Sequence, residues 1–180
     1  SYTFEKGFIY GITAPSGTGK TTLLNLIGNI LKPAQGEIET DFKTGIAYVF
    51  QEPELLSQLT IAENIALPLT AYLKKEIAFE QAISILQKME LDGFENRFPN
   101  ELSFGQQQRA AIARALTYPS PLLLMDEPFK GLDEALSRRI IKRIRERQTE
   151  NGQTILFTSH NPGELRLFAD KTVRLDPTSH

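Results

Sequence analysis

A glycine-rich loop at residues 14–21, APSGTGKT, is the segment whose residue types and spacing point most directly to chemistry. It lies between an apolar run, FIYGIT at 8–13, and a segment of helical spacing, TTLLNLIGNIL at 21–31, so we expect a strand, a loop and a helix. In such a loop backbone N–H groups point at phosphate oxygens, Lys20 neutralises the β- and γ-phosphates, and the Thr21 hydroxyl ligates Mg²⁺. The residues expected at the phosphates are Ala14, Pro15, Ser16, Gly17, Thr18, Gly19, Lys20, Thr21 and Thr22.

A glycine-rich turn with an exposed lysine is the alternative interpretation of this loop. A pair of carboxylates further along the chain favours the phosphate site. Asp126 and Glu127 directly follow LLLM at 122–125, an apolar run typical of a strand buried on both faces of a parallel sheet. Asp126 would reach the coordination shell of the Mg²⁺ ion, and Glu127 would polarise an attacking water molecule. An acidic turn before Pro128 is the alternative, but together the two segments predict binding and hydrolysis of ATP.

The composition excludes several other classes of protein. Of the 180 residues, 41% are hydrophobic and 23% charged, which is ordinary for a folded globular domain. Cysteine is absent, so a disulfide framework and a cysteine-based metal site are excluded, and we expect a cytoplasmic location. The net charge of −2 argues against a nucleic-acid partner. The basic run at 138–147 has Leu136, Ile140 and Ile144 at helical spacing, which predicts an amphipathic helix with a solvated basic face.

Strands alternate with helices along most of the chain, which indicates a parallel sheet. Besides 8–13 and 122–125, we expect strands at 37–40, 46–50, 154–158 and 171–175. Capping-box spacing predicts helices after Thr60 and Ser103, with a further helix over 73–91. Asp133 and Asn161 are expected to cap two more. The fold class is therefore α/β, a P-loop NTPase core at 1–52 and 112–180 with an all-helical subdomain inserted at 53–111.

Several motifs occur in a fixed order, and together they resemble the nucleotide-binding domains of ABC transporters over nearly the whole chain. Gln51 follows YVF, LSFGQQQR occupies 102–109, DEP ends the acidic strand, GLD lies at 131–133 and TSH at 158–160. LSFGQ corresponds to the ABC signature LSGGQ, which other P-loop ATPases lack.

The resemblance implies a role for each matching residue. Gln51 would sense Mg²⁺ and the attacking water, Glu127 would be the catalytic base, and His160 would contact the γ-phosphate. The signature residues Ser103, Gly105 and Gln106 would bind the γ-phosphate of ATP held by a second subunit, with Asp133 at the seam between the two. The cofactors implied are ATP and Mg²⁺, with metal ligation by Thr21, Gln51 and Asp126.

The implied partners are a second copy of the chain in a homodimer, membrane permease subunits and a solute-binding protein, with the chain peripheral on the inner face of the membrane. Permease docking would involve Leu55, Leu56, Leu59 and Tyr72. DEPFKGLD resembles importers of nitrate, sulfonate and taurine, whereas LLNLIG, ENIALPL and ELSFGQQQR resemble lipoprotein-release and macrolide-efflux proteins, and we favour the importer. A non-transport ABC ATPase and a regulatory subunit that binds ATP with little turnover are the alternatives.

The chain departs from the family pattern at three places. Ala14 replaces the first glycine of the loop, which costs little if its φ is negative. Phe104 replaces the first glycine of the signature pair and adds a large side chain at the expected dimer interface. Tyr2 and Phe4 are too close to Lys20 along the chain to be the aromatic residue that stacks on adenine in the family.

Overall fold

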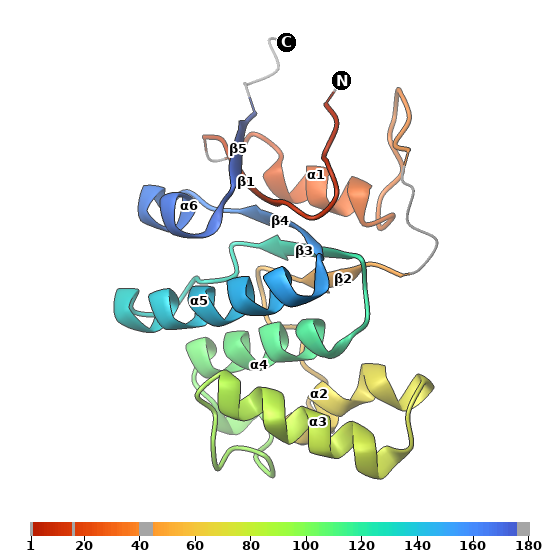
Figure 1. The fold of residues 1–180 in the computed structure, drawn as a ribbon, viewed down its shortest axis with the longest axis vertical. Helices are drawn as coiled ribbons and strands as arrows, with labels where there is room; N and C mark the ends of the chain where they lie inside the picture. The colour runs from red at the N-terminus through yellow and green to blue at the C-terminus, as the bar shows by residue number, and fades with distance from the viewer. Residues whose placement is uncertain (1, 16, 40–44, 176–180) are drawn as a thin grey trace. The chain divides into compact units, whose positions relative to one another are not determined.

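The fold was analysed in a computed structural model that describes residues 2–15, 17–39 and 45–175 (Figure 1). The chain divides into two compact units. Unit 1 comprises 1–48, 120–128 and 141–180, and unit 2 comprises 49–119 and 129–140. Ser16 and residues 40–44 and 176–180, including His180, lie outside the described residues.

Five strands form one sheet: β1 (Ile9–Thr13), β2 (Ala47–Val49), β3 (Leu122–Asp126), β4 (Thr154–Thr158) and β5 (Lys171–Arg174). Their order is β2-β3-β4-β1-β5. The pairs β1–β4, β1–β5 and β3–β4 are parallel, with Ile12 and Asp126 both opposite Thr158. The carboxyl ends of β1, β3 and β4 therefore meet at one edge, and the residues that follow these strands are brought together there.

Both faces of the sheet are covered, as the continuous apolar runs predicted. Tyr10 and Ile12 pack with Leu24 and Ile27 of α1 (Lys20–Ile27) on one face. On the other face, a Cβ placed on Gly11 would lie 2.7 Å from Leu165 in α6 (Pro162–Phe168), so glycine lets this helix approach the strand closely. Alternate residues of β1 thus pack against α1 and α6. The phosphate loop therefore follows a strand that is covered by a helix on each face.

One predicted strand, at 37–40, is not formed by those of its residues that the structure describes. Residues 37–39 are exposed and outside regular structure in the described part of the chain, whereas residue 40 lies outside it. Ile38 stands alone between Glu37 and Glu39, so the segment has no apolar face to bury and nothing to offset the cost of ordering it. The other expected strands are present within one or two residues of their predicted ends.

Unit 2 contains three mutually packed helices, α2 (Ile61–Ala66), α3 (Lys75–Lys88) and α4 (Phe104–Thr117), and two short 3₁₀ turns, η1 (Leu67–Ala71) and η2 (Pro99–Glu101). Both predicted capping boxes are formed, Thr60 with Glu63 and Ser103 with Gln106. The sequence correctly placed α3, but two of its isoleucines, Ile77 and Ile83, are exposed while Ala78 and Ala82 are buried.

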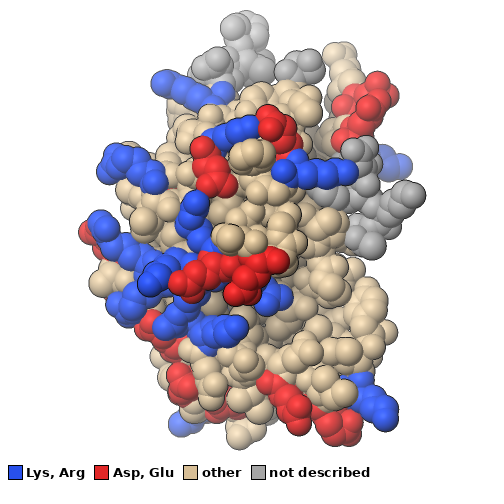
Figure 2. Space-filling model, in the orientation of Figure 1, with Lys and Arg blue, Asp and Glu red and all other residues tan. Residues whose placement is uncertain are grey.

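The helix α5 (Glu134–Asn151) carries the basic run, and its first part belongs to unit 2 and its second to unit 1. Ile140 and Ile144 are buried, as the helical spacing predicted. Figure 2 shows acidic side chains interspersed among the basic ones on this helix. Arg138 pairs with Glu134, Lys142 with Glu146 and Arg145 with Asp170. These pairs neutralise much of the run and argue against a nucleic-acid surface.

Candidate nucleotide-binding site

The phosphate loop has the backbone conformation that an anion site needs. Gly17 and Gly19 have φ of 81° and 89°, the left-handed region in which glycine avoids the steric cost of a Cβ. The α1 helix then begins at Lys20 with no side-chain cap among the described residues and no acidic residue in its first turn. The N–H groups of this turn are therefore open to phosphate oxygens. In contrast, α2, α4 and α6 are capped by Thr60, Ser103 and Asn161.

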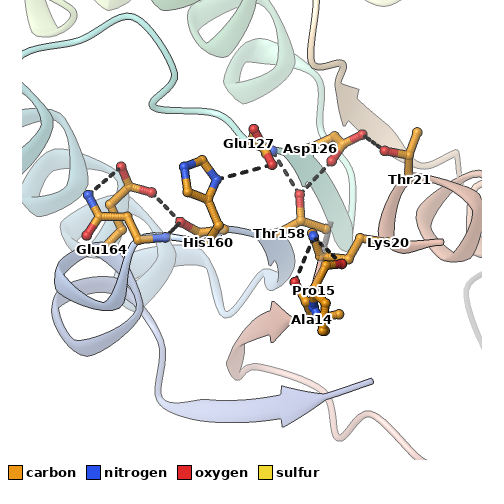
Figure 3. A network of polar contacts seen from close by, with 11 residues as sticks. Ala14, Pro15, Lys20, Thr21, Asp126, Glu127, Thr158, His160 and Glu164 are labelled. Atoms are coloured by element: carbon orange, nitrogen blue, oxygen red, sulfur yellow. Dashed lines mark hydrogen bonds and ion pairs between the residues drawn. The ribbon is translucent and has the colours of Figure 1, made fainter. Parts of the chain in front are cut away.

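Lys20 lies across the loop that precedes it. Its Nζ donates to the carbonyl oxygens of Ala14 at 3.0 Å and Pro15 at 3.5 Å (Figure 3). Thr18 closes the loop by donating its N–H and hydroxyl to Pro15 O, at 3.3 and 2.6 Å. Ala14 is not among the described residues with positive φ, so alanine is tolerated here, as expected.

Asp126, at the end of β3, is 2% exposed, and each of its carboxylate oxygens accepts a hydrogen bond from a threonine hydroxyl. Thr21 Oγ1 donates to Oδ2 at 2.6 Å, and Thr158 Oγ1 donates to Oδ1 at 2.5 Å. Figure 3 shows Asp126 between these two threonines. The hydroxyl of Thr21 in the loop thus contacts the first carboxylate of the acidic pair. Thr158, at the end of β4, is an additional contact: it belongs to the TSH motif, but the sequence predicted no role for it.

Oxygen ligands of this kind suit a small, hard cation such as Mg²⁺, which keeps several waters and takes few protein ligands. Among the described residues, no group of three or more His, Cys, Asp or Glu side chains is positioned to hold a metal. A cation here would therefore be held by Thr21 and Asp126 together with phosphate oxygens of the nucleotide. When bound, it would neutralise the charge that develops on the transferred phosphoryl group.

Glu127 has an unusual backbone conformation for its residue type, with φ of 45°. A left-handed conformation costs a residue with a Cβ about 1–2 kcal/mol, so the surrounding structure must hold it. Its N–H donates to Thr158 Oγ1 at 2.9 Å, and its carboxylate Oε1 lies 3.4 Å from His160 Nδ1. The predicted base and the predicted γ-phosphate residue therefore face each other, with the His160 side chain 74% exposed.

A small network holds the turn that carries His160. Ser159 is buried, and its hydroxyl donates to Glu164 Oε2 at 2.5 Å and accepts from Asn161 N at 3.0 Å. Asn161 Oδ1 accepts from Gly163 N and caps α6, as predicted. Of these contacts only the cap was predicted from the sequence, because the contacts of Ser159 and Glu164 depend on how the turn folds back on the helix.

Tyr48, in β2, is affected by the same carboxylate. Burial raises the pKa of its phenol above the ordinary range, and the negative charge of Asp126 adds to the effect. Its hydroxyl donates to Asn25 Oδ1 at 2.9 Å, which ties β2 to α1.

Thr22 lies in the first turn of α1, in unit 1, whereas the predicted residues Gln51, Ser103, Gly105, Gln106 and Asp133 lie in unit 2. Ser103 and Gln106 bind each other: Ser103 N donates to Gln106 Oε1 at 2.8 Å, and Gln106 N donates to Ser103 Oγ at 3.4 Å. Asp133 caps α5 by accepting from Leu136 N at 2.9 Å. Gln51 is half-buried, and the preceding carbonyl, of Phe50, accepts from Gln108 Nε2 at 3.4 Å.

Phe104, which stands where the family signature LSGGQ has its first glycine, packs against the GLD motif at 131–133. A Cβ on Gly105 would lie 2.7 Å from Gly131 O, and a Cβ on Gly131 would lie 2.7 Å from Phe104 Cδ1. Lys130 Nζ lies 5.7 Å from the centre of the Phe104 ring. The bulky residue thus packs on the GLD segment of its own chain, and both glycines are required for the close approach.

A family model described as ABC transporter matches residues 1–130 of this chain. The chain belongs to the ABC transporter family. Thiamine import ATP-binding protein ThiQ of Shigella flexneri and of Escherichia coli O157:H7 is 38% identical over 183 residues, which cover 96% of this chain and 79% of each relative.

Solved structures agree with this assignment. The ATP-binding cassette MJ0796, in a dimeric post-hydrolysis state bound to ADP and Pi, has a TM-score of 0.90 and 34% identity, covering 98% of this chain and 84% of its own. A second dimeric structure of MJ0796 has a TM-score of 0.89 and 33% identity, covering 97% of this chain and 83% of its own. The predicted α/β fold and the predicted ABC ATPase activity are thereby confirmed. Within the described residues, no helix has the length and apolar character to cross a membrane.

Proposed function

We propose that this ABC ATPase powers an importer, and that two copies close over ATP held between them. Glu127 acts as the base. His160 and Lys20 contact the γ-phosphate. The Mg²⁺ ion is coordinated by Thr21, Asp126 and Gln51. Ser103, Gly105 and Gln106 complete the site of the second copy, with Asp133 at the seam. The division into a core at 1–52 and 112–180 and a helical subdomain at 53–111 is part of this proposal.

The observation that carries the proposal is the meeting of three strand ends in unit 1. Asp126 is the last residue of β3, Lys20 and His160 follow β1 and β4, and Glu127 lies 3.4 Å from His160. An anion site, a carboxylate that can hold Mg²⁺ and an adjacent base are the parts that in-line phosphoryl transfer to water requires. Because ThiQ is a thiamine import protein and the MJ0796 structures are dimeric, both the importer and the dimer are supported.

Docking to a permease, with a solute-binding protein on the far side, completes the proposed transporter and would place the chain on the cytoplasmic face of the membrane. Leu56 and Tyr72 of unit 2 are 38% and 62% exposed, which suits an apolar contact with such a partner, whereas Leu55 and Leu59 are half-buried.

The Glu127→Gln variant tests the catalytic assignment. We expect turnover to fall at least 100-fold, and an ATP-dependent dimer to accumulate in size-exclusion chromatography, because ATP is bound but not hydrolysed. Glu150→Gln makes the same charge change on the exposed end of α5 and should behave as wild type. Wild-type turnover in Glu127→Gln would overturn the catalytic assignment. A monomer under all conditions would overturn the closure of two copies.

A further inference from the structure

Thr158 contacts both acidic residues of the site with a single hydroxyl group. Oγ1 donates to Asp126 Oδ1 at 2.5 Å and accepts from Glu127 N at 2.9 Å. A hydroxyl has one donor and two acceptor positions, so both bonds form at once. Figure 3 shows the Thr158 hydroxyl joined to the Asp126 carboxylate on one side and to the Glu127 backbone nitrogen on the other. One side chain on β4 therefore contacts two consecutive residues, Asp126 at the end of β3 and Glu127 in the turn beyond it.

The position of Thr158 follows from strand register. Thr158 and Asp126 are opposite each other in the parallel β3–β4 pair, and Thr158 is 0% exposed. Valine has nearly the same shape and is equally suited to a buried strand, so packing alone does not require a hydroxyl there. A buried hydroxyl is unfavourable unless it is paired. Here it is paired on both sides, and both partners belong to the site.

The two bonds have different consequences. Thr158 occupies Oδ1 of Asp126 and fixes the carboxylate plane, which leaves Oδ2 beside the Thr21 hydroxyl, where a Mg²⁺ ion would bind. The bond to the Glu127 N–H holds a residue whose φ is 45° and which would otherwise relax. Loss of the hydroxyl would free both the Asp126 carboxylate and the Glu127 backbone.

We propose that Thr158 is a positioning residue that aims Asp126 at the metal and holds Glu127 in its strained backbone conformation. This inference rests on the proposed roles of Asp126 and Glu127. It differs from them because Thr158 acts through these two residues, which its hydroxyl contacts.

The test compares Thr158→Val with Thr158→Ser, which keeps the hydroxyl. Thr154→Val is the matched control, because Thr154 lies at the other end of β4, is also buried, and uses its hydroxyl to accept from Gly7 N at 2.9 Å. Mn²⁺ affinity is measured by electron paramagnetic resonance with a non-hydrolysable ATP analogue, and kcat and KM are measured with Mg²⁺ATP. Thr158→Ala is the second hydroxyl-free variant, for use if Thr158→Val does not fold.

We expect Thr158→Val to weaken Mn²⁺ binding about 10-fold, a change equivalent to about 1.4 kcal/mol, and to lower kcat about 10- to 100-fold with little change in KM. Thr158→Ser should lie within about 3-fold of wild type, and Thr154→Val should match wild type in both measurements. Equal Mn²⁺ affinity in wild type and Thr158→Val, or equal losses in Thr158→Val and Thr154→Val, would overturn the inference. Glu127→Gln in the same series separates the two proposals: if its kcat is normal, the catalytic assignment fails, while the Mn²⁺ affinities still decide the role of Thr158.

Discussion

The Phe104 ring occupies the space beside Gly131 that a larger residue would need, because a Cβ there would lie 2.7 Å from Phe104 Cδ1. Gly131 also has a φ of 80°. Gly131→Ala should therefore lose about 1–2 kcal/mol of unfolding free energy to backbone strain and about 1–3 kcal/mol more to overpacking. Urea unfolding monitored by circular dichroism measures the loss.

A double-mutant cycle separates these two contributions. In a Phe104→Ala background the overpacking disappears and Gly131→Ala should cost only the backbone strain. Gly93→Ala is the control for strain, since Gly93 has a φ of 81° and nothing among the described residues within 4 Å of its ideal Cβ. Equal costs for Gly131→Ala and Gly93→Ala in the wild-type background would show that Phe104 does not press on this segment.

The two capping boxes of unit 2 allow stability and function to be tested separately. Thr60 Oγ1 accepts from Glu63 N at 3.2 Å, and Ser103 Oγ accepts from Gln106 N at 3.4 Å. Replacing either cap with alanine should cost about 1 kcal/mol of unfolding free energy. If Ser103 also contacts the ATP of a second copy, only Ser103→Ala should abolish the ATP-dependent dimer of the Glu127→Gln protein. Loss of the dimer in both cap variants would contradict that role.

Local signals in the sequence predicted most of the fold. The caps at Thr60, Ser103 and Asn161 depend on residues three or fewer positions away, so spacing alone identified them. The strands β3 and β4 are apolar throughout and were equally clear. The expected strand at 37–40 was wrong because a single isoleucine between glutamates has no face to bury.

The contacts of the site were less accessible to sequence reasoning. Thr158 contacts Asp126 only because β4 pairs with β3 in one particular register, and the two strands are separated in sequence by the whole of α5. The positive φ of Glu127 had no local signal, since glutamate is not typical of that conformation. Motif order identified the residues of the site, whereas the hydroxyl that links them is a product of tertiary structure.

Buried and exposed arginines that share Glu90 as partner should differ in their effect on stability. Arg109 is 8% exposed and donates to the carbonyl oxygens of Met89 at 2.7 Å and Glu90 at 2.6 Å. Arg139 is exposed and binds the Glu90 carboxylate with two hydrogen bonds, at 2.8 and 2.9 Å.

Arg109→Leu removes the hydrogen bonds from its guanidinium to the two carbonyls and should cost about 2–4 kcal/mol of unfolding free energy. Arg139→Gln removes a solvated ion pair and should cost at most about 1 kcal/mol. Lysine at position 109 should not rescue stability, because a single ammonium group cannot reproduce the planar fork of donors. Thermal unfolding of the three variants checks the order, and an Arg139→Gln protein as unstable as Arg109→Leu would contradict it.

Alkaline pH should destabilise the protein through Tyr48. Burial and the Asp126 charge raise its pKa in the folded protein above the value of about 10 expected in the unfolded chain. Between these two values the unfolded state binds fewer protons than the folded state, so the unfolding free energy falls as the pH rises. The contribution is fully present below pH ~10 and is lost as the pH increases toward the folded pKa.

Tyr48→Phe should flatten this decline above pH ~10, at a cost of about 1 kcal/mol at neutral pH for the lost hydrogen bond to Asn25. Chemical denaturation at a series of pH values from neutral to alkaline gives both quantities. Tyr2→Phe is the control for general alkaline effects, since Tyr2 is 57% exposed. If the wild-type and Tyr48→Phe proteins lose stability in parallel above pH ~10, the Tyr48 pKa is the same in the folded and unfolded states and its ionisation does not contribute to alkaline unfolding.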